Sequence, residues 1–254
     1  MLLAFDVGNT NIVCGVYKDR NLIRHWRVAT DTLQTADGYA ALLGNLFQLT
    51  GLSFKEVEDI IISTVVPPII PILETMSQRY FHTKPILVGP GIKTGIKLKY
   101  ENPREIGADR IVNVVGAYEQ YGGPLIVIDI GTATTFDVVD TNGDFLGGVI
   151  SPGLGTAAEG LFQRAAKLPR IELVTPKNII CRNTINGMQA GLIFGFAGHI
   201  EAIVHRIKKE YGREMEVVAT GGFAKMIAKE STTIDRIDYF LTLTGLRALY
   251  ERNQ

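Results

Sequence analysis

The stretch Asp6-Val7-Gly8-Asn9-Thr10-Asn11 decides the fold, because it ends one apolar run and opens another. The run Leu2–Asp6 predicts a short buried strand, and Ile12–Tyr17 predicts a second strand after a tight turn. A third apolar run follows at Asn21–Ala29, so the chain is expected to open with a three-stranded meander. A tight hairpin places glycine or asparagine where φ is positive, and we expect that geometry in this turn.

The same pattern returns 123 residues later, at Asp129-Ile130-Gly131-Thr132-Ala133-Thr134. Aligned without a gap, Asp6 falls on Asp129 and Gly8 on Gly131. Both segments give an apolar strand, Asp-x-Gly, a polar turn and further apolar strands. Chance likeness of two β-meanders is the alternative, but Asp-x-Gly at the same point of both favours internal duplication.

The remaining segments alternate helical and strand patterns, which predicts an α/β protein. Helices are expected at 36–50, 67–81 and about 183–211, with strands at 57–65, 85–88 and 216–219. We expect two related domains, residues 1–117 and 118–254, with the ligand cleft between them.

The first turn has the chemistry of a phosphate site. Its backbone N–H groups, with the side chains of Thr10 and Asn11, can line a phosphate-sized concavity. Asp6 at the strand end suits a hydrated Mg²⁺ that bridges nucleotide phosphates. A plain hairpin with Asp6 capping its own turn is the alternative for this segment alone, and the repeated copy favours phosphate binding.

A third glycine turn, Ala219-Thr220-Gly221-Gly222, follows another buried strand. Glycines there would let a base or ribose lie against the backbone. Taken alone it is an ordinary strand-to-helix turn. In combination with the two hairpins, the three turns point to a nucleotide site.

These three motifs, in this order, resemble the phosphate-1, phosphate-2 and adenosine motifs of the actin/hexokinase/Hsp70 ATPase superfamily. Three further segments, Gly89–Gly95, Gly107-Ala108-Asp109-Arg110 and Gly147–Gly153, resemble type III pantothenate kinases, and the likeness covers essentially the whole chain. The resemblance implies duplicated ribonuclease H-like (actin-like) domains with mixed sheets. It also implies ATP-dependent phosphorylation of pantothenate to 4'-phosphopantothenate, the first step of coenzyme A biosynthesis, by a homodimer. The role of the loop Gly89–Gly95 stays unassigned.

The resemblance also implies roles for single residues. Asp109 would be the proton acceptor, and Asp129 would bind a monovalent cation, K⁺ or NH₄⁺. The Mg²⁺ bound through water at Asp6 is predicted from the residues themselves and not from the resemblance. The nucleotide would contact Asp6, Val7, Gly8, Asn9, Thr10, Asn11, Ile12, Val13 and Thr132. Pantothenate would contact Tyr100, Gly107, Ala108, Asp109, Arg110 and Thr184.

Residue type alone leaves alternatives for both aspartates. Asp109 stands where a helix pattern begins, so residue type alone favours an N-cap over a base. Asp129 could satisfy the N–H groups of its own hairpin. The GADR match favours the base at Asp109.

Composition excludes several classes of partner. The chain has 254 residues, with 26 basic and 26 acidic side chains, so no net field favours nucleic acid or an anionic membrane. Its two cysteines, Cys14 and Cys181, form no CxxC motif and suit a reducing cytoplasm. The first residues have the pattern of a strand and not of a signal peptide, and no apolar run reaches about 18 residues.

Other functions remain as alternatives. The scaffold would also serve another actin-like small-molecule kinase, although Tyr100, GADR and Thr184 argue against that. A non-catalytic nucleotide-binding regulator is the other possibility, which the joint presence of Asp6, Asp109 and Asp129 disfavours. A GxGxxA match at Gly153–Ala158 is a weak dinucleotide signal, because Pro152 interrupts its turn.

Overall fold

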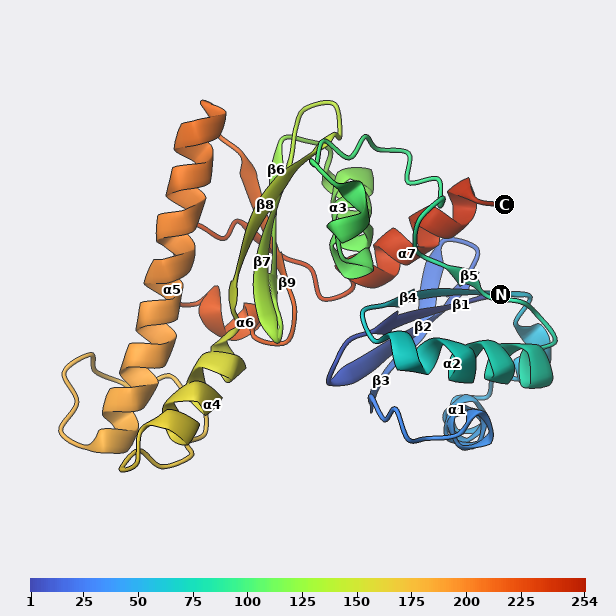
Figure 1. Cartoon of the computed structure of the whole chain (residues 1–254), viewed down its shortest axis with the longest axis horizontal. Coiled ribbons are helices and arrows are strands. Elements are labelled where there is room, and N and C mark those ends of the chain that lie inside the picture. Colours follow the sequence, from blue (N-terminus) through green and yellow to red (C-terminus); the bar gives the residue numbers. More distant parts are fainter. The chain divides into compact units, whose positions relative to one another are not determined.

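The computed structural model describes residues 1–254 and divides into two compact units (Figure 1). The first unit contains Met1–Gly95, Asn102–Glu119 and Leu241–Gln254, and the second contains Ile96–Glu101 and Gln120–Phe240. Each unit has one five-stranded mixed sheet with helices, so the predicted α/β class with duplicated actin-like domains is confirmed.

The first sheet has the order β3-β2-β1-β4-β5. The meander strands pair antiparallel, whereas β1 pairs parallel with β4, and β4 with β5. The strands are β1 (Leu2–Val7), β2 (Asn11–Lys18), β3 (Asn21–Ala29), β4 (Asp59–Thr64) and β5 (Ile86–Leu87). The helices of this unit are α1 (Ala36–Leu49), α2 (Ile70–Met76), α3 (Ala108–Tyr121, whose last two residues belong to the second unit) and α7 (Leu241–Arg252).

Short helical turns join these elements. They are η1 (Phe54–Glu56), η2 (Pro67–Ile69), η3 (Ser77–Phe81) and η4 (Pro103–Glu105). The predicted helix over 67–81 is therefore three pieces, in which α2 lies between a 3₁₀ turn and a π-helical turn. Two prolines, Pro67 and Pro68, open the first piece, because proline lacks the N–H that a helix interior needs.

The second sheet has the order β10-β9-β6-β7-β8. Read in reverse, from β8 to β10, each of its strands takes the place of the corresponding strand in the order β3 to β5 of the first sheet. Its β6–β7–β8 meander is antiparallel, and β6 pairs parallel with β9, and β9 with β10. The strands are β6 (Leu125–Ile130), β7 (Ala133–Val139), β8 (Phe145–Pro152), β9 (Glu216–Thr220) and β10 (Arg236–Ile237). The helices are α4 (Leu154–Arg164), α5 (Thr184–Tyr211) and α6 (Ala224–Ile227).

The two hairpins differ by one residue, which corrects the ungapped alignment. Asp6 pairs with Val13 across the first hairpin, but Asp129 pairs with Thr135 across the second. The second turn is therefore one residue shorter, so equivalent positions are 122 residues apart along β2 and β7 and 123 residues apart again along β3 and β8. Sequence similarity hid this difference because both turns are short and polar.

The first unit has its main core on one face of the sheet, beneath α1 and α2 (Figure 1). Phe5 and Ile62 from the strands meet Leu43 and Phe47 of α1 there. Helix α1 begins where the Thr35 side chain accepts a hydrogen bond from the Gly38 N–H at 3.1 Å.

The last helix, α7, covers the opposite face of the first sheet. The Leu243 side chain packs against Gly15 of β2, where any Cβ would lie only 2.8 Å from Leu243 Cδ1. Gly245 meets the backbone of α3 so closely that a Cβ would overlap the Val112 carbonyl. The expected division at 117/118 put this helix in the second domain. Its apolar residues cannot specify which of two similar sheets they cover.

The second unit buries one face of its sheet under α4, α5 and α6 (Figure 1). Ile128 and Phe136 from the strands pack against Ile193 and Ile200 of α5. Helix α5 is long and apolar enough to cross a membrane by length and composition, but half of its most apolar window is buried in this unit. Core helices of water-soluble proteins meet the same criterion.

Candidate active site

The first hairpin is an exposed turn whose backbone carbonyls accept hydrogen bonds from Thr30. Gly8 N–H donates to the Asn11 carbonyl at 3.0 Å, closing the turn. Thr30, just after β3, donates its hydroxyl to the Gly8 carbonyl at 2.7 Å and its N–H to the Thr10 carbonyl at 3.0 Å. The N–H groups of Asn9 and Thr10, at the exposed tip, donate no hydrogen bond within the protein.

The positive φ expected in the first hairpin is wrong, and the second hairpin has none either. Neither Gly8 nor Gly131 is among the residues with positive φ, and no other residue of either turn is. The turn is nevertheless tight at Gly8, because a Cβ there would lie 3.3 Å from the Asn11 carbonyl oxygen. Thr30 is a contributor that the sequence did not reveal, since a lone threonine after a strand has no distinctive pattern.

Asp6 lies half-buried at the carboxyl end of β1, on the sheet face that α7 covers further along. Its register partner on β4 is Ser63, which is fully buried and whose hydroxyl has no hydrogen-bond partner. A buried hydroxyl without a partner costs stability, so its presence beside Asp6 marks a place built for polar contact.

Asp109 belongs to the same unit and sits in the first turn of α3. It is not the N-cap, because the helix already begins at Ala108. Its Oδ1 accepts a hydrogen bond from the Arg110 N–H at 2.8 Å. A Cβ on Gly107 would lie 2.5 Å from that oxygen, so glycine lets the carboxylate fold against the helix start.

Burial raises the pKa of Asp109, because it disfavours the charged carboxylate, while the Arg110 N–H and positive charge act the other way. The Arg110 side chain is itself buried, at 5% exposure. A raised pKa makes this carboxylate a stronger base than an exposed aspartate.

Val65 connects Asp109 to the first hairpin. Its N–H donates to the Val7 carbonyl at 3.2 Å, and its Cγ1 would lie 3.9 Å from a Cβ on Gly107. The structure thus brings the predicted base and the end of β1 to one edge of the first unit. In α/β sheets, ligands bind outside the carboxyl ends of the parallel strands.

The second hairpin is packed tightly against the turn that opens α4. Gly153 donates its N–H to the Thr132 carbonyl at 3.0 Å, and Thr156 donates its hydroxyl to the same oxygen at 2.7 Å. A Cβ on Gly153 would overlap the carbonyl oxygens of Gly131 and Thr132. Thr132 itself lies at the tip of the turn and is exposed.

The Gly221 turn lies directly behind Asp129. Gly221 has a φ of +96°, and a Cβ there would lie 2.5 Å from Asp129 Oδ1 and 2.7 Å from the Ile130 nitrogen. Asp129 pairs in register with Thr220, just as Asp6 pairs with Ser63. The second Asp-x-Gly hairpin and the third glycine turn therefore meet at one edge of the second sheet.

Two predicted substrate residues lie on separate elements of the second unit. Tyr100 stacks on Phe145 at the start of β8, with 6.0 Å between ring centroids and 15° between ring planes. Thr184 is the exposed first residue of α5, next to Asn183, which accepts the Asn186 N–H at 2.9 Å.

The donor set fits an ion bound largely through phosphates and water. No group of three or more His, Cys, Asp or Glu side chains gathers as ligands anywhere in the chain. Mg²⁺ in nucleotide sites is usually held by one or two carboxylates with phosphates and waters, and Asp6 is a carboxylate of that kind. Asp129 places a single carboxylate beside the second turn in the same way.

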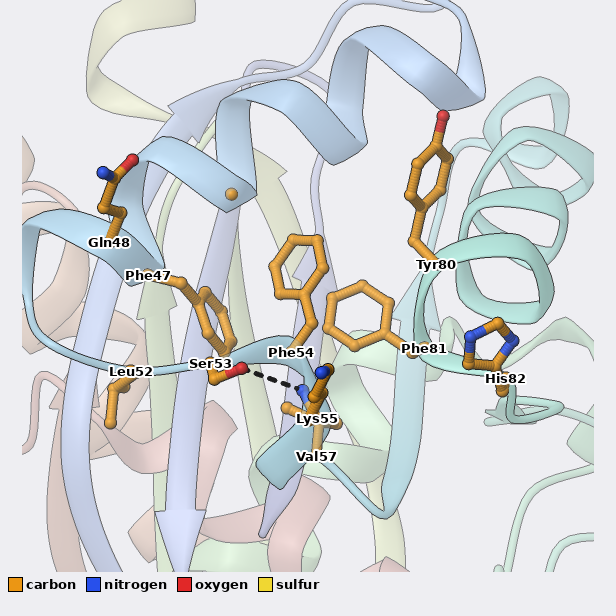
Figure 2. Close-up of a pocket in the computed structure, with 11 residues that line it drawn as sticks. Phe47, Gln48, Leu52, Ser53, Phe54, Lys55, Val57, Tyr80, Phe81 and His82 are labelled. Carbon is orange, nitrogen blue, oxygen red and sulfur yellow. Dashed lines mark hydrogen bonds between the residues drawn. The ribbon is translucent and has the colours of Figure 1, made fainter.

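Two pockets of the structure lie away from these turns. The larger, of 620 Å³, is lined by Phe47, Phe54 and Phe81 among others, at the edge where β4 begins. Figure 2 shows Phe54 and Phe81 side by side, with 4.2 Å between their ring centroids. The second, of 530 Å³, lies where β6 and β9 begin, next to Leu125 and Glu216. Neither is lined by a predicted site residue.

Comparison with known proteins gives a consistent result. The family model described as Type III pantothenate kinase matches residues 2–206. The chain is 54% identical over 254 residues to a type III pantothenate kinase of an Exiguobacterium species, with all of both chains covered. It is 53% identical to the type III pantothenate kinase of Geobacter sulfurreducens, again over the full length of both.

Solved structures at low identity share the fold. The activator of the 2-hydroxyisocaproyl-CoA dehydratase from Clostridium difficile, with bound ADPNP, matches with a TM-score of 0.60 at 16% identity, covering 98% of this chain and 93% of the other. Component A of the (R)-2-hydroxyglutaryl-CoA dehydratase from Acidaminococcus fermentans matches with a TM-score of 0.57 at 16% identity, covering 98% and 96%.

Proposed function

The chain belongs to the type III pantothenate kinase family and phosphorylates pantothenate with ATP in coenzyme A biosynthesis. On this premise we propose which residues bind the two substrates and which residue accepts the proton. The observation that carries the proposal is the repeated hairpin. Asp-x-Gly ends the central strand of both sheets, at the edge where ligands bind in such sheets.

The first hairpin is proposed to bind the nucleotide. The N–H groups of Asn9 and Thr10 suit phosphate oxygens, since they have no acceptor within the protein. The contact set is Asp6, Val7, Gly8, Asn9, Thr10, Asn11, Ile12 and Val13, with Thr132 from the second hairpin. Asp6 is proposed to hold Mg²⁺ through water, and the ion would supply charge neutralisation on the phosphates.

Asp109 is proposed to be the proton acceptor. Phosphoryl transfer proceeds through a loose transition state, so a carboxylate need only orient the pantothenate hydroxyl and take its proton late. The raised pKa of Asp109 supports this role, because the group is more basic than an exposed aspartate.

Pantothenate is proposed to contact three segments of the chain. The start of α3 contributes Gly107, Ala108, Asp109 and Arg110, and the planar Arg110 guanidinium suits the substrate's carboxylate. Tyr100 and Thr184 complete the set. This contact set is supported by the solvent exposure of its residues, which are exposed or half-exposed. Arg110 is the exception, because it is buried.

Asp129 is proposed to bind a monovalent cation, K⁺ or NH₄⁺. Its single carboxylate beside the second turn supports an ion of low charge, which would partly neutralise phosphates nearby. The protein is further proposed to act in the cytoplasm as a homodimer.

A coupled assay tests this assignment. ADP release is measured with and without pantothenate, and with KCl, NH₄Cl or LiCl at equal ionic strength. Release that depends on pantothenate and rises with K⁺ or NH₄⁺ over Li⁺ supports the proposal. Equal rates in all three salts would remove the cation role of Asp129.

A further inference from the structure

Lys99 lies one residue before Tyr100 and makes an ion pair with two buried aspartates. Its Nζ is 2.8 Å from Asp144 Oδ2 and 3.5 Å from Asp140 Oδ2. We propose that Lys99 is a positioning residue, which fixes Tyr100 for contact with pantothenate. This inference rests on the proposed role of Tyr100 in substrate binding.

The two aspartates form a rigid anchor at the turn between β7 and β8. Asp140 Oδ1 accepts the N–H groups of Asn142 at 2.8 Å and Asp144 at 2.9 Å. The side chains of Asp140 and Asp144 are only 12% and 9% exposed, so two carboxylates stand close together with little water. Such a pair needs a cation, and Lys99 supplies it.

The titration of these groups agrees with the geometry. The hydrogen bond to Asp144 raises the pKa of Lys99, and the charge of both aspartates adds to this. Burial acts to raise the pKa of Asp140, but the N–H groups of Asp144 and Asn142, with Lys99, lower it overall. Both groups therefore stay charged throughout the physiological range.

The 96–101 segment that carries Tyr100 needs such an anchor. It belongs to the second unit, while the residues on either side of it along the chain, Gly95 and Asn102, belong to the first. Its backbone is held at Phe145 by two hydrogen bonds, from Lys99 N–H at 2.8 Å and to the Lys97 carbonyl at 2.9 Å. The Lys99 side chain adds the contact that fixes the segment along its length.

The Tyr100 ring is placed by its immediate surroundings. It stacks on Phe145, which is 1% exposed and therefore fixed in the core. On the same strand, Gly147 has a φ of +118°, and a Cβ there would lie 3.7 Å from the ring. A shift of the 96–101 segment would move the ring off this platform, and displacements of about 1 Å in a site can cost on the order of 10²-fold in rate.

The kinetic test uses Lys99→Met, which keeps the length of the side chain and removes its charge. We expect the KM for pantothenate to rise about tenfold, with the KM for ATP unchanged, and Lys99→Arg to restore most of the loss. Lys97→Met is the matched control, because Lys97 is exposed, lies on the same segment and contributes only its carbonyl. An unchanged KM for pantothenate in Lys99→Met overturns the proposal.

Asp144→Asn provides a second variant if Lys99→Met folds poorly. It removes the nearest partner of Lys99 at nearly constant shape, and the same rise in the KM for pantothenate is expected. A double mutant then shows whether Lys99 acts through Tyr100. In a Tyr100→Ala background, Lys99→Met should add less than twofold, whereas a full additional tenfold rise contradicts the proposal.

Hydrogen exchange separates this inference from the substrate assignment. In Lys99→Met, the peptide N–H of residue 99, which is bonded to the Phe145 carbonyl, should exchange faster without any substrate present. Unchanged exchange refutes the anchoring role. Faster exchange together with a normal KM in Tyr100→Ala would instead refute the proposed contact of Tyr100 with pantothenate.

Discussion

Asp6 and Ser63 lie directly opposite each other on neighbouring parallel strands, and Asp129 and Thr220 hold the same relation in the second sheet. Each sheet therefore presents one carboxylate and one hydroxyl at the end of its central strands. The Ser63 hydroxyl is fully buried and has no partner within the protein. The repeated pair is the strongest structural sign that both hairpins serve polar ligands.

Asp6→Asn should weaken use of ATP. The change removes the negative charge proposed to hold Mg²⁺, and kcat/KM for ATP should fall on the order of 10²-fold. Steady-state kinetics at several Mg²⁺ concentrations measure this, with Asp19→Asn in the exposed β2–β3 turn as the control. Wild-type dependence on Mg²⁺ in Asp6→Asn would show that this carboxylate does not hold the ion.

Asp109→Asn should lose turnover while keeping ATP binding. Loss of a general base typically costs about 10²-fold or more, and the amide still accepts the Arg110 N–H. The values of kcat and of the ATP dissociation constant check the two parts. Glu105→Gln, an exposed carboxylate four residues earlier, should behave as the wild type. Near-normal kcat in Asp109→Asn would exclude the proton-acceptor role.

The same substitution should stabilise the protein at neutral pH. The pKa of Asp109 is raised in the folded state, so its charged form favours unfolding above that pKa, and the penalty disappears below the unfolded pKa. Asp109→Asn should therefore melt a few degrees higher than the wild type at pH 7. The difference should shrink as the pH falls through the raised pKa and should be gone below about 4, the ordinary aspartate pKa.

Thermal denaturation of wild type and Asp109→Asn across this pH range measures the effect. A variant that melts lower than the wild type at pH 7 would mean that the contacts of the carboxylate outweigh its burial. Such a result would also remove burial as the physical reason for its basicity.

Gly221→Ala should damage the second hairpin. The residue has a positive φ, and its new Cβ would press on Asp129 Oδ1 and the Ile130 backbone. We expect a loss of about 2–3 kcal/mol in the free energy of unfolding and a higher KM for ATP. Urea denaturation measures the first and kinetics the second.

Gly160→Ala is the matched control for that change. Gly160 lies within α4 with nothing within 4 Å of its Cβ position, so alanine there should stabilise by about 0.5–1 kcal/mol. If Gly221→Ala behaves like Gly160→Ala, the close contact with Asp129 has no functional or structural weight.

The sequence predicted the repeated parts of this molecule well. The strands of the two meanders, the Asp-x-Gly turns and helices such as α1 follow from local apolar period and turn residues. The duplication appeared as Asp6 and Asp129 in equivalent places, and the matching strand orders confirm it. These features are local, so neighbouring residues are enough to specify them.

The rest depends on contacts between distant residues. Nothing in the apolar pattern of α7 says that Leu243 packs on Gly15, more than 200 residues earlier. Likewise the lysine at position 99 looks like a surface charge until the fold brings Asp140 and Asp144 to it. The one-residue difference between the turns was hidden because pairing, and not composition, defines it.

The position of α7 has a consequence for synthesis of the chain. The first sheet is made within the opening hundred residues, yet α7, which packs on one of its faces, is made only at residues 241–252. The Tyr250 hydroxyl of this helix donates a hydrogen bond at 2.5 Å to Asp59, the first residue of β4. During synthesis on the ribosome, the first unit therefore lacks its last helix until residues 241–252 have been made. The second unit ends at Phe240, so all of its residues are present earlier.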